Sequence, residues 1–225
     1  MSLRLDANMV EMFLREAQNK ADDPIKIVIQ NAIAASCTIF VKEGKEQWTG
    51  SGFHIGNGLI ATASHVAPPK LINNYMGLQV SFDGKNSFGA RVVDSQPNLD
   101  VAILYCEDIP DSVTAVKLAD SETAEIGDIV AAIGSPEGWH DTATVGRISN
   151  IHQTVQNADS PAWSDLIFVD ADILQGISGG MVIGTDGLVY GLVIGVTGEH
   201  ADLAIGENSV CPSNKIKSLL QKINV

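Results

Sequence analysis

Ser178 is the residue whose surroundings most favour chemistry. It lies among glycines, in the segment Gly176-Ile177-Ser178-Gly179-Gly180, with apolar residues on both sides. A serine hydroxyl becomes a good nucleophile only when a base takes its proton and N–H groups stabilise the resulting oxyanion. The glycines allow the chain to bend and to expose such N–H groups. The segment therefore predicts a nucleophilic serine, and because it also fits the pattern G-x-S-x-G, two catalytic arrangements compete for it.

The first arrangement is the strand-to-helix turn of α/β-hydrolases, in which the acid and the base follow the serine in the sequence. Here the residues after Ser178, Met181 to Gly187, have the pattern of a strand and a turn. The only later histidine is His200, in a polar segment. The context therefore excludes the α/β-hydrolase arrangement.

The second arrangement places the base and its orienting acid before the serine. His65 follows the apolar run that begins at Leu59, and Asp100 opens the apolar run that ends at Tyr105. A partly buried carboxylate can fix the tautomer of an imidazole and stabilise its cation. Asp94 is a competing acid, but only Asp100 opens a strongly apolar strand. The predicted catalytic residues are therefore His65, Asp100 and Ser178, and we expect the other histidines to be ordinary.

The elements that position these residues are predicted to be short strands bounded by Gly, Pro, Asn and Asp. Asn57-Gly58 between two alternating runs predicts a hairpin. Helices are predicted only near the two ends, at residues 6–19 and 215–223, and residues 107–125 have the composition of a linker between halves. This pattern predicts an all-β protein built from a pair of barrels. The strands are expected at 36–41, 50–63, 78–82, 89–93, 101–105, 129–133, 142–149, 165–170, 180–183 and 188–196.

Three blocks, in the order His, Asp, Ser, resemble the signature of trypsin-like (chymotrypsin-fold) serine peptidases. They are residues 62–65, 100–104 and 176–180, and residues 127–136, 146–149 and 212–214 resemble the HtrA/Deg branch more narrowly. The resemblance implies two six-stranded antiparallel β-barrels with short N-terminal and C-terminal helices. The implied divisions are an N-terminal helical segment 1–32, barrels at 33–115 and 116–211, and a C-terminal helix 212–225. No PDZ module is expected after that helix.

The same resemblance assigns roles. Ser178 would attack the peptide carbonyl, His65 would take and return the proton, and Asp100 would orient His65. The N–H groups of Gly176 and Ser178 would form the oxyanion hole. The implied function is a serine endopeptidase that hydrolyses protein or peptide substrates through an acyl-enzyme. The different-class alternative is a catalytically silent peptidase-like module that binds extended peptides by strand addition.

Three positions near the serine raise questions about specificity and activation. Ile177 stands where digestive trypsin-like enzymes have the aspartate that pairs with a new N-terminus, so we expect no activation of that kind. It also suggests that the oxyanion loop orders on binding of substrate or on oligomer contact. Asp172 and Gln175 are the substrate-binding candidates. Asp172 stands where trypsin has its S1 acid, and the alternative is an aspartate that faces solvent.

Composition excludes several other classes of protein. The chain has 225 residues with a net charge of −13, which argues against nucleic acid and anionic membranes as partners. No run of about 18 apolar residues predicts a membrane span. We find no metal-ligand cluster and no phosphate-binding loop, so we expect no metal and no cofactor.

The start of the chain and its cysteines bear on assembly and location. The apolar face of residues 6–19 would pack on the same molecule or build a homo-oligomer, and the two alternatives are weighed evenly. The three cysteines, Cys37, Cys106 and Cys211, are predicted to be buried free thiols in a reducing compartment, with a single long-range disulfide as the alternative. With no signal-peptide pattern at the start, a cytoplasmic location is expected rather than a secreted one.

Overall fold

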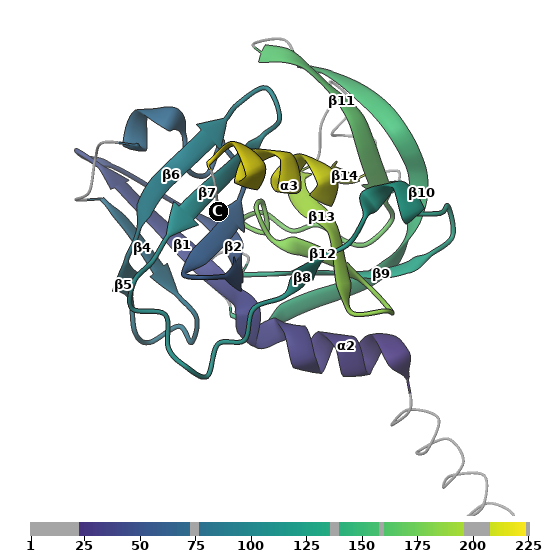
Figure 1. Cartoon of the computed structure of the whole chain (residues 1–225), viewed down its shortest axis with the longest axis horizontal. Coiled ribbons are helices and arrows are strands. Elements are labelled where there is room, and N and C mark those ends of the chain that lie inside the picture. The colour runs from purple at the N-terminus through teal and green to yellow at the C-terminus, as the bar shows by residue number, and fades with distance from the viewer. Residues whose placement is uncertain (1–22, 73–76, 136–139, 158–159, 196–207, 224–225) are drawn as a thin grey trace, which may run out of the picture.

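The computed structural model describes residues 23–72, 77–135, 140–157, 160–195 and 208–223. The helix expected at residues 6–19 and His200 lie outside these residues. Two sheets stand side by side, the first built from the N-terminal half of the chain and the second from the C-terminal half (Figure 1). The predicted all-β, double-barrel fold is confirmed.

The first sheet has seven strands among the described residues, in the order β5-β4-β1-β2-β3-β7-β6. β5 and β6 are separated only by Ala90, and β5 pairs with β4 while β6 pairs with β7. Residues 88–96 thus form one curved strand that pairs with both edges of the sheet. Counted as one strand, this run closes the described strands into a barrel of six. The strands are β1 (Ser36–Glu43), β2 (Glu46–Gly56), β3 (Leu59–Thr62), β4 (Leu78–Ser81), β5 (Phe88–Gly89), β6 (Arg91–Gln96) and β7 (Val101–Tyr105).

The second sheet closes on itself, because β12 pairs with both β9 and β13. Its described part is therefore a barrel of six strands, and β8 adds to β13 in parallel. The sequence patterns missed β8 and β14. The strands are β8 (Lys117–Leu118), β9 (Ile129–Gly134), β10 (Thr142–Asn157), β11 (Ser160–Val169), β12 (Met181–Gly184), β13 (Leu188–Gly195) and β14 (Asn208–Pro212).

The predicted hairpin joins β2 to β3. Asn57 has φ +53° and Gly58 has φ +74°, so both central residues adopt the left-handed conformation that a type I′ turn requires. Gly58 is also closely packed, since a Cβ there would come 2.8 Å from the Cys106 carbonyl oxygen. This turn sets the register in which β3 runs back along β2 and delivers the chain to His65.

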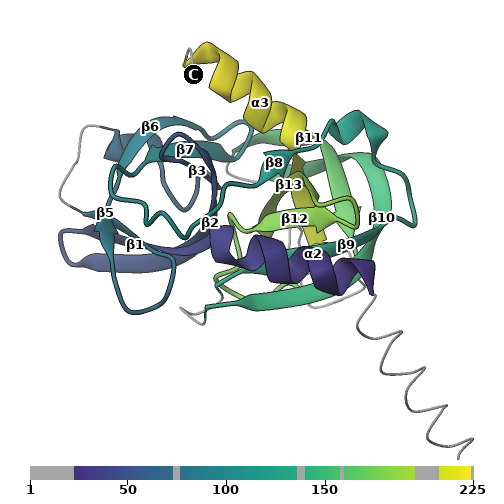
Figure 2. The same ribbon diagram turned by 60° about the horizontal axis from the view of Figure 1, so that its bottom comes forward.

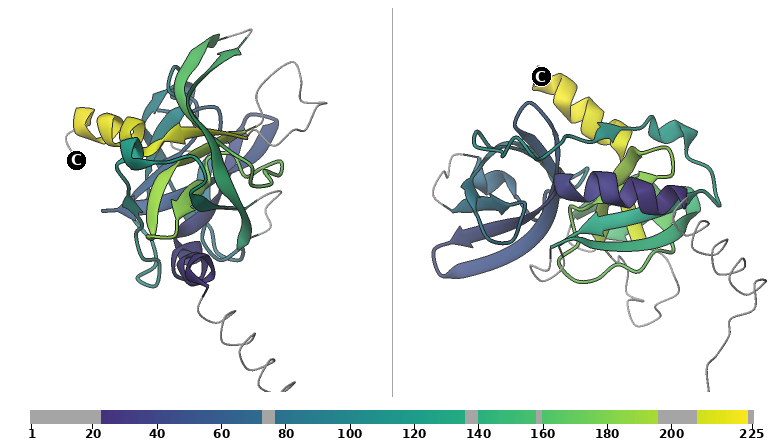
Figure 3. Two further views of the ribbon diagram at one scale, coloured as in Figure 1. Left: turned by 90° about the vertical axis from the view of Figure 1, so that its right-hand side faces the viewer. Right: turned by 90° about the horizontal axis from the view of Figure 1, so that it is seen from below.

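Two helices flank the barrels. α2 (Pro24–Ala32) begins directly after Asp23, whose carboxylate accepts a hydrogen bond of 3.2 Å from the Ile25 N–H, and proline occupies its first turn. Pro24 thus stands in the first turn, where a helix tolerates proline. α2 packs against β9 and β12 of the second barrel (Figures 2 and 3).

The C-terminal helix connects the two halves. α3 (Ser213–Lys222) buries Ile216 and Leu219, and it contacts β7 of the first sheet as well as β13 and β14 of the second. Short 3-10 turns occur at Ile33–Ala35 (η1), Pro69–Leu71 (η2) and Ser121–Thr123 (η3). None of the helices in the described ranges is long and apolar enough to cross a membrane. The residue boundaries proposed for the two barrels stay predictions.

Candidate active site

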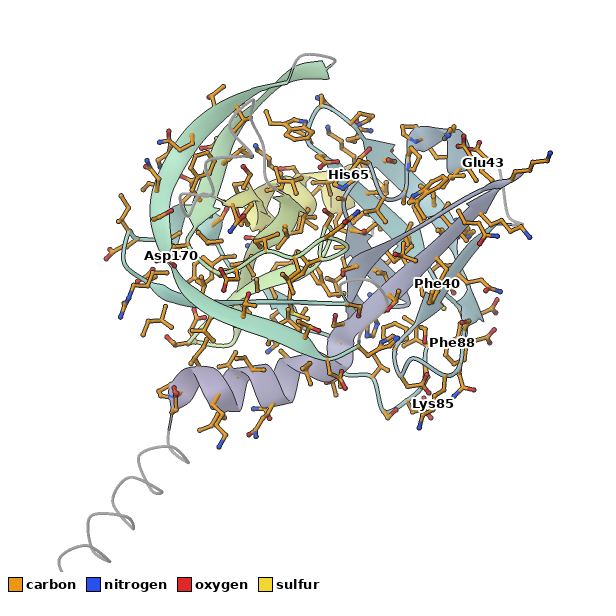
Figure 4. The ribbon with its side chains drawn as sticks, turned by 180° about the vertical axis from the view of Figure 1, so that it is seen from behind. Phe40, Glu43, His65, Lys85, Phe88 and Asp170 are labelled. Carbon is orange, nitrogen blue, oxygen red and sulfur yellow. The ribbon has the colours of Figure 1, made fainter. Side chains whose placement is uncertain are left out.

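His65 and Asp100 form the best-defined polar pair of the site. The ring Nδ1 of His65 lies 2.8 Å from Asp100 Oδ2, and the backbone N–H of His65 donates a hydrogen bond of 2.9 Å to Asp100 Oδ1. The Asp100 side chain is 2% exposed, whereas that of His65 is 45% exposed. His65 lies on the side of the first barrel that faces the second (Figure 4). A buried acid thus orients a histidine whose ring is partly exposed.

The end of β3 shapes the turn that carries His65. The N–H groups of Val66 and Ala67 both donate to the carbonyl of Ala63 at 3.1 Å, which closes a tight turn around His65. Beneath it, the hydroxyls of Ser64 and Ser95 are 2.8 Å apart, and Ser95 Oγ donates to the Ala67 carbonyl at 2.8 Å. The turn is therefore fastened to β6 by buried hydrogen bonds.

Asp100 occupies a strained position between β6 and β7. Its φ is +50°, in the left-handed region, which aspartate tolerates better than most residues. The turn before β7 is closed by hydrogen bonds from the Leu99 N–H to the Gln96 carbonyl at 3.0 Å and from the Asp100 N–H to the Pro97 carbonyl at 3.3 Å. An unusual backbone conformation at a buried carboxylate is typical of a functional site.

Ser178 lies in a tightly hydrogen-bonded loop between β11 and β12. The Ile177 N–H donates to the Leu174 carbonyl at 3.2 Å, and Gly176 has φ +91°, as the third residue of a type II turn requires. Gly179, with φ +85°, donates to the Val193 carbonyl at 2.7 Å. These bonds hold the chain on both sides of Ser178, and the expectation that the loop orders on binding of substrate or on oligomer contact stays a prediction.

The side chain of Ile177 anchors this loop to the second barrel. It is fully buried, in the apolar core of the second barrel, together with Ile148, Val182 and Val193. A methyl group at Gly134 would come 2.7 Å from it, so the packing around Ile177 is close. The apolar packing of Ile177 thus holds the Ser178 loop. By the resemblance, digestive trypsin-like enzymes have at this position an aspartate that pairs with the new N-terminus.

The serine loop and the histidine turn adjoin each other. The Ser51 N–H of β2 donates to the Ser178 carbonyl at 2.8 Å. A Cβ at Gly179 would lie 2.3 Å from Thr62 Oγ1 and 3.0 Å from the Ala63 nitrogen, so the loop touches the end of β3. In the described hydrogen bonds the His65 ring is joined to Asp100 only. The fold thus brings all three candidate residues to one junction between the barrels.

The remaining candidates lie beside this junction. Asp172 and Gln175 are both exposed, and the Asp172 backbone carbonyl accepts a hydrogen bond of 2.7 Å from Thr144 Oγ1. An exposed Asp172 side chain fits the alternative of an aspartate that faces solvent. Neither Gly176 nor Ser178 uses its backbone N–H in a hydrogen bond between described residues.

The sequence analysis missed Ser51, whose hydroxyl donates to the Gly176 carbonyl at 2.8 Å. Its signal was the pair of flanking glycines, since glycine inside a strand marks a close approach of another backbone.

Other polar groups stay outside the site. Among the described residues no three His, Cys, Asp or Glu side chains form a group that could hold a metal ion. Cys37, Cys106 and Cys211 are buried free thiols, and burial raises the pKa of Cys211 to about 12. His152 pairs with Asp165 at 2.7 Å on the exposed surface of β10 and β11.

Comparison with known proteins agrees with this geometry. The family profile described as the trypsin-like peptidase domain matches residues 50–192, which is more than half of the chain, so the chain belongs to that family. The fold and the family together place it among the trypsin-like peptidases.

Curated relatives narrow the class to the HtrA/Deg branch. The periplasmic serine endoprotease DegP of Salmonella typhimurium is 31% identical over 176 residues, which cover 77% of this chain and 35% of DegP. Protease Do-like 5, chloroplastic, of Arabidopsis thaliana is 32% identical over 188 residues, covering 78% of this chain and 57% of that protein. The chain thus spans about a third of the length of the DegP relatives it matches.

A solved structure resembles the chain over most of its length. The active form of the Rv3671c protease from M. tuberculosis has a TM-score of 0.75 and 28% identity, over 89% of this chain and 87% of that one. The expected cytoplasmic location is contradicted, because the curated relatives are periplasmic or chloroplastic proteases. The pattern at the start of the chain and the buried thiols were a poor guide to the compartment.

Proposed function

We propose that this chain is a serine endopeptidase that hydrolyses peptide bonds through an acyl-enzyme on Ser178. The observation that carries the proposal is the His65–Asp100 pair, with a buried acid on Nδ1 and an exposed ring, beside the Ser178 loop. A carboxylate on Nδ1 keeps the proton on that nitrogen, so Nε2 has the lone pair that a general base needs. Sequence similarity to DegP supports the same assignment.

The reaction would proceed in two halves. In the first, His65 takes the proton of the Ser178 hydroxyl as Ser178 attacks the peptide carbonyl, and then passes it to the leaving amine. In the second, water attacks the ester with His65 again acting as base, which releases the acid and restores Ser178. Asp100 holds the ring throughout and stabilises its cationic form.

The proposed oxyanion hole consists of the N–H groups of Gly176 and Ser178. Both belong to the loop held by the type II turn and by Ile177, and neither is used in a hydrogen bond between described residues. Donors held in place before the reaction stabilise the developing charge without reorganisation, and losing one typically costs about 10²–10³ in turnover. The ordered loop favours the enzyme over the silent peptide-binding module.

Labelling with a fluorophosphonate probe tests the proposed function. We expect the wild-type chain to be labelled and Ser178→Ala to show no labelling. Ser149→Ala, which changes an exposed serine on β10, serves as the matched control and should label like the wild type. Folded wild-type protein that is not labelled under any condition would instead favour the binding module.

Substrates and assembly are further parts of the proposal. Proteins or peptides are the proposed substrates, and the exposed residues Asp172 and Gln175, in the loop before Ser178, stay candidates for contact with them. A homo-oligomer built through residues 6–19 is one of the two alternatives for that segment, the other being packing on the same molecule. Analytical ultracentrifugation of the full chain and of a chain without those residues tests this, since the same number of chains per particle in both would exclude it.

A further inference from the structure

Ser51 uses all of its polar groups at the junction between the barrels. It is fully buried on β2. Its N–H donates to the Ser178 carbonyl at 2.8 Å, and its hydroxyl donates to the Gly176 carbonyl at 2.8 Å. Its hydroxyl also accepts from the Ser135 N–H at 2.9 Å, and its carbonyl accepts from Thr62 Oγ1 at 2.7 Å.

Two of these hydrogen bonds enclose the proposed oxyanion hole. The carbonyls of Gly176 and Ser178 are held by one residue, so the three residues 176–178 are fixed at both ends against β2. Because a peptide unit is planar, these two bonds directly fix the N–H groups of Ile177 and Gly179, which share the units of the Gly176 and Ser178 carbonyls. The Ser178 N–H lies in the unit between them, whose carbonyl, that of Ile177, accepts a hydrogen bond of 2.8 Å from the Gly180 N–H. The Gly176 N–H lies in the unit directly before, so its direction is restricted by the fixed unit that follows it. The N–H groups that would bind the oxyanion lie within this short segment.

The other two hydrogen bonds tie that segment to its surroundings. Thr62 ends β3, the strand that leads to His65, and Ser135 follows β9 of the second barrel. Ser51 therefore connects the histidine turn, the serine loop and the second barrel through one buried side chain and its backbone.

Space around Ser51 is limited. A Cβ at Gly134 would come 2.8 Å from Ser51 Oγ, and one at Gly179 would come 2.2 Å from the Ser51 carbonyl oxygen. Alanine at position 51 would leave the Gly176 carbonyl without its donor. The Gly176 carbonyl would then lose the one hydrogen bond that the described residues give it, which favours movement of the loop to find another partner.

We propose that Ser51 is a positioning residue for peptide hydrolysis, whose hydroxyl holds the Gly176 carbonyl and so keeps the N–H groups of Gly176 and Ser178 in place for the oxyanion. The inference rests on the proposed function. It assigns to Ser51 a contribution to the transition state and not to binding of the peptide.

The test compares Ser51→Ala with Ser135→Ala. Ser135 is also a buried serine, but its hydroxyl has no partner among the described residues, and the N–H that reaches Ser51 survives the substitution. For Ser51→Ala we expect kcat for a peptide substrate to fall by about 10- to 100-fold, with KM within about twofold of the wild type. Ser135→Ala should keep both values.

The affinities of two ligands distinguish a positioning role of Ser51 from a merely structural one. A peptide boronic acid forms a tetrahedral adduct with the serine, whereas the product peptide binds without one. We expect Ser51→Ala to weaken the boronic acid in proportion to the loss of kcat and to leave the affinity of the product peptide unchanged. Equal weakening of both ligands, or an active Ser51→Ala with wild-type kcat, would overturn the proposal.

An inactive wild type and a Ser51→Ala variant that does not fold have different consequences for the proposal. A folded wild type that neither turns over peptide nor reacts with fluorophosphonate contradicts the proposed function itself. If Ser51→Ala does not fold, Ser51→Cys replaces it, since a thiol is similar in size and a weaker donor. Reduced kcat with retained product affinity in Ser51→Cys supports the role of the hydroxyl, and wild-type kcat overturns it.

Discussion

Asp100 holds His65 by two different atoms. One carboxylate oxygen faces the ring Nδ1 at 2.8 Å, and the other accepts the backbone N–H of the same histidine at 2.9 Å. The ring and the backbone that carries it are therefore fixed by one buried side chain. This double contact distinguishes Asp100 from a simple surface partner of histidine, such as Asp165 beside His152.

Asp100→Asn should lower kcat by about 10³–10⁴-fold, as the same change does in the best-known triad. The amide nitrogen cannot accept a hydrogen bond, so one of the two contacts to His65 is lost or the ring changes tautomer. Asp94→Asn is the control. Asp94 is the competing acid, and its Oδ1 accepts hydrogen bonds from Ser95 and Gln96 instead. Steady-state kinetics measure kcat of both variants. An equal loss of kcat in Asp100→Asn and Asp94→Asn would contradict the role of Asp100.

Ile177→Asp should destabilise the protein strongly, by about 3–5 kcal/mol, because it places an unpaired charge in the core of the second barrel. Ile177→Val keeps the apolar contact and should cost only about 0.5–1.5 kcal/mol. Urea unfolding measures both. A stable, active Ile177→Asp would show that the loop does not depend on this anchor.

Gly179→Ala should remove activity and lower stability. Its φ is +85°, and the new Cβ would come 2.2 Å from the Ser51 carbonyl oxygen. Gly187→Ala is matched in φ, at +77°, but meets nothing within 4 Å. The control should therefore cost only the strain of a left-handed residue, about 1–2 kcal/mol, and remain active. The melting temperature measures the stability of each variant, and fluorophosphonate labelling measures its activity. Similar values for Gly179→Ala and Gly187→Ala would contradict the close contact between Gly179 and Ser51.

His54 should make the protein less stable in acid. Burial lowers the pKa of His54, with the Val113 backbone partly opposing the shift, and neither ring nitrogen has a hydrogen-bond partner among the described residues. A lowered folded pKa means that the unfolded chain binds the proton more tightly. The stability contributed by neutral His54 is thus fully present above the ordinary value of about 6.5 and is lost as pH falls below it.

His54→Leu should therefore flatten the decline in unfolding free energy between about pH 7.5 and pH 5. His152→Ala provides a control of opposite sign. The hydrogen bond to Asp165 raises the pKa of His152, so that pair stabilises the protein at low pH and its contribution disappears as pH rises. An unchanged pH slope in His54→Leu would exclude His54 as the cause.

Asp172→Ala should leave the cleavage profile unchanged. The side chain is exposed, and a carboxylate in solvent gives little selection for Lys or Arg at P1. A peptide library compares the variant with the wild type. Loss of a preference for basic residues in Asp172→Ala would restore the S1 role that the resemblance to trypsin suggested.

The sequence alone determined the order and type of the candidate residues and most of the strands. His65 and Asp100 border apolar strands, and Asn57-Gly58 marks the hairpin before His65; these signals are local, because they depend on backbone preferences and on alternation. β8, with two residues, and β14, which follows a long segment without a clear pattern, had no comparable local signal.

Only the tertiary structure decided what surrounds Ser178. From the sequence, Ile177 left open how the oxyanion loop is held in place. In the structure its side chain lies in the core of the second barrel. Ser51 had no chemistry of its own in the sequence, since a serine inside a strand is common. Its importance depends on residues 125 and 127 positions further along the chain, Gly176 and Ser178. Such long-range contacts arise from the packing of two barrels, which local preferences do not encode.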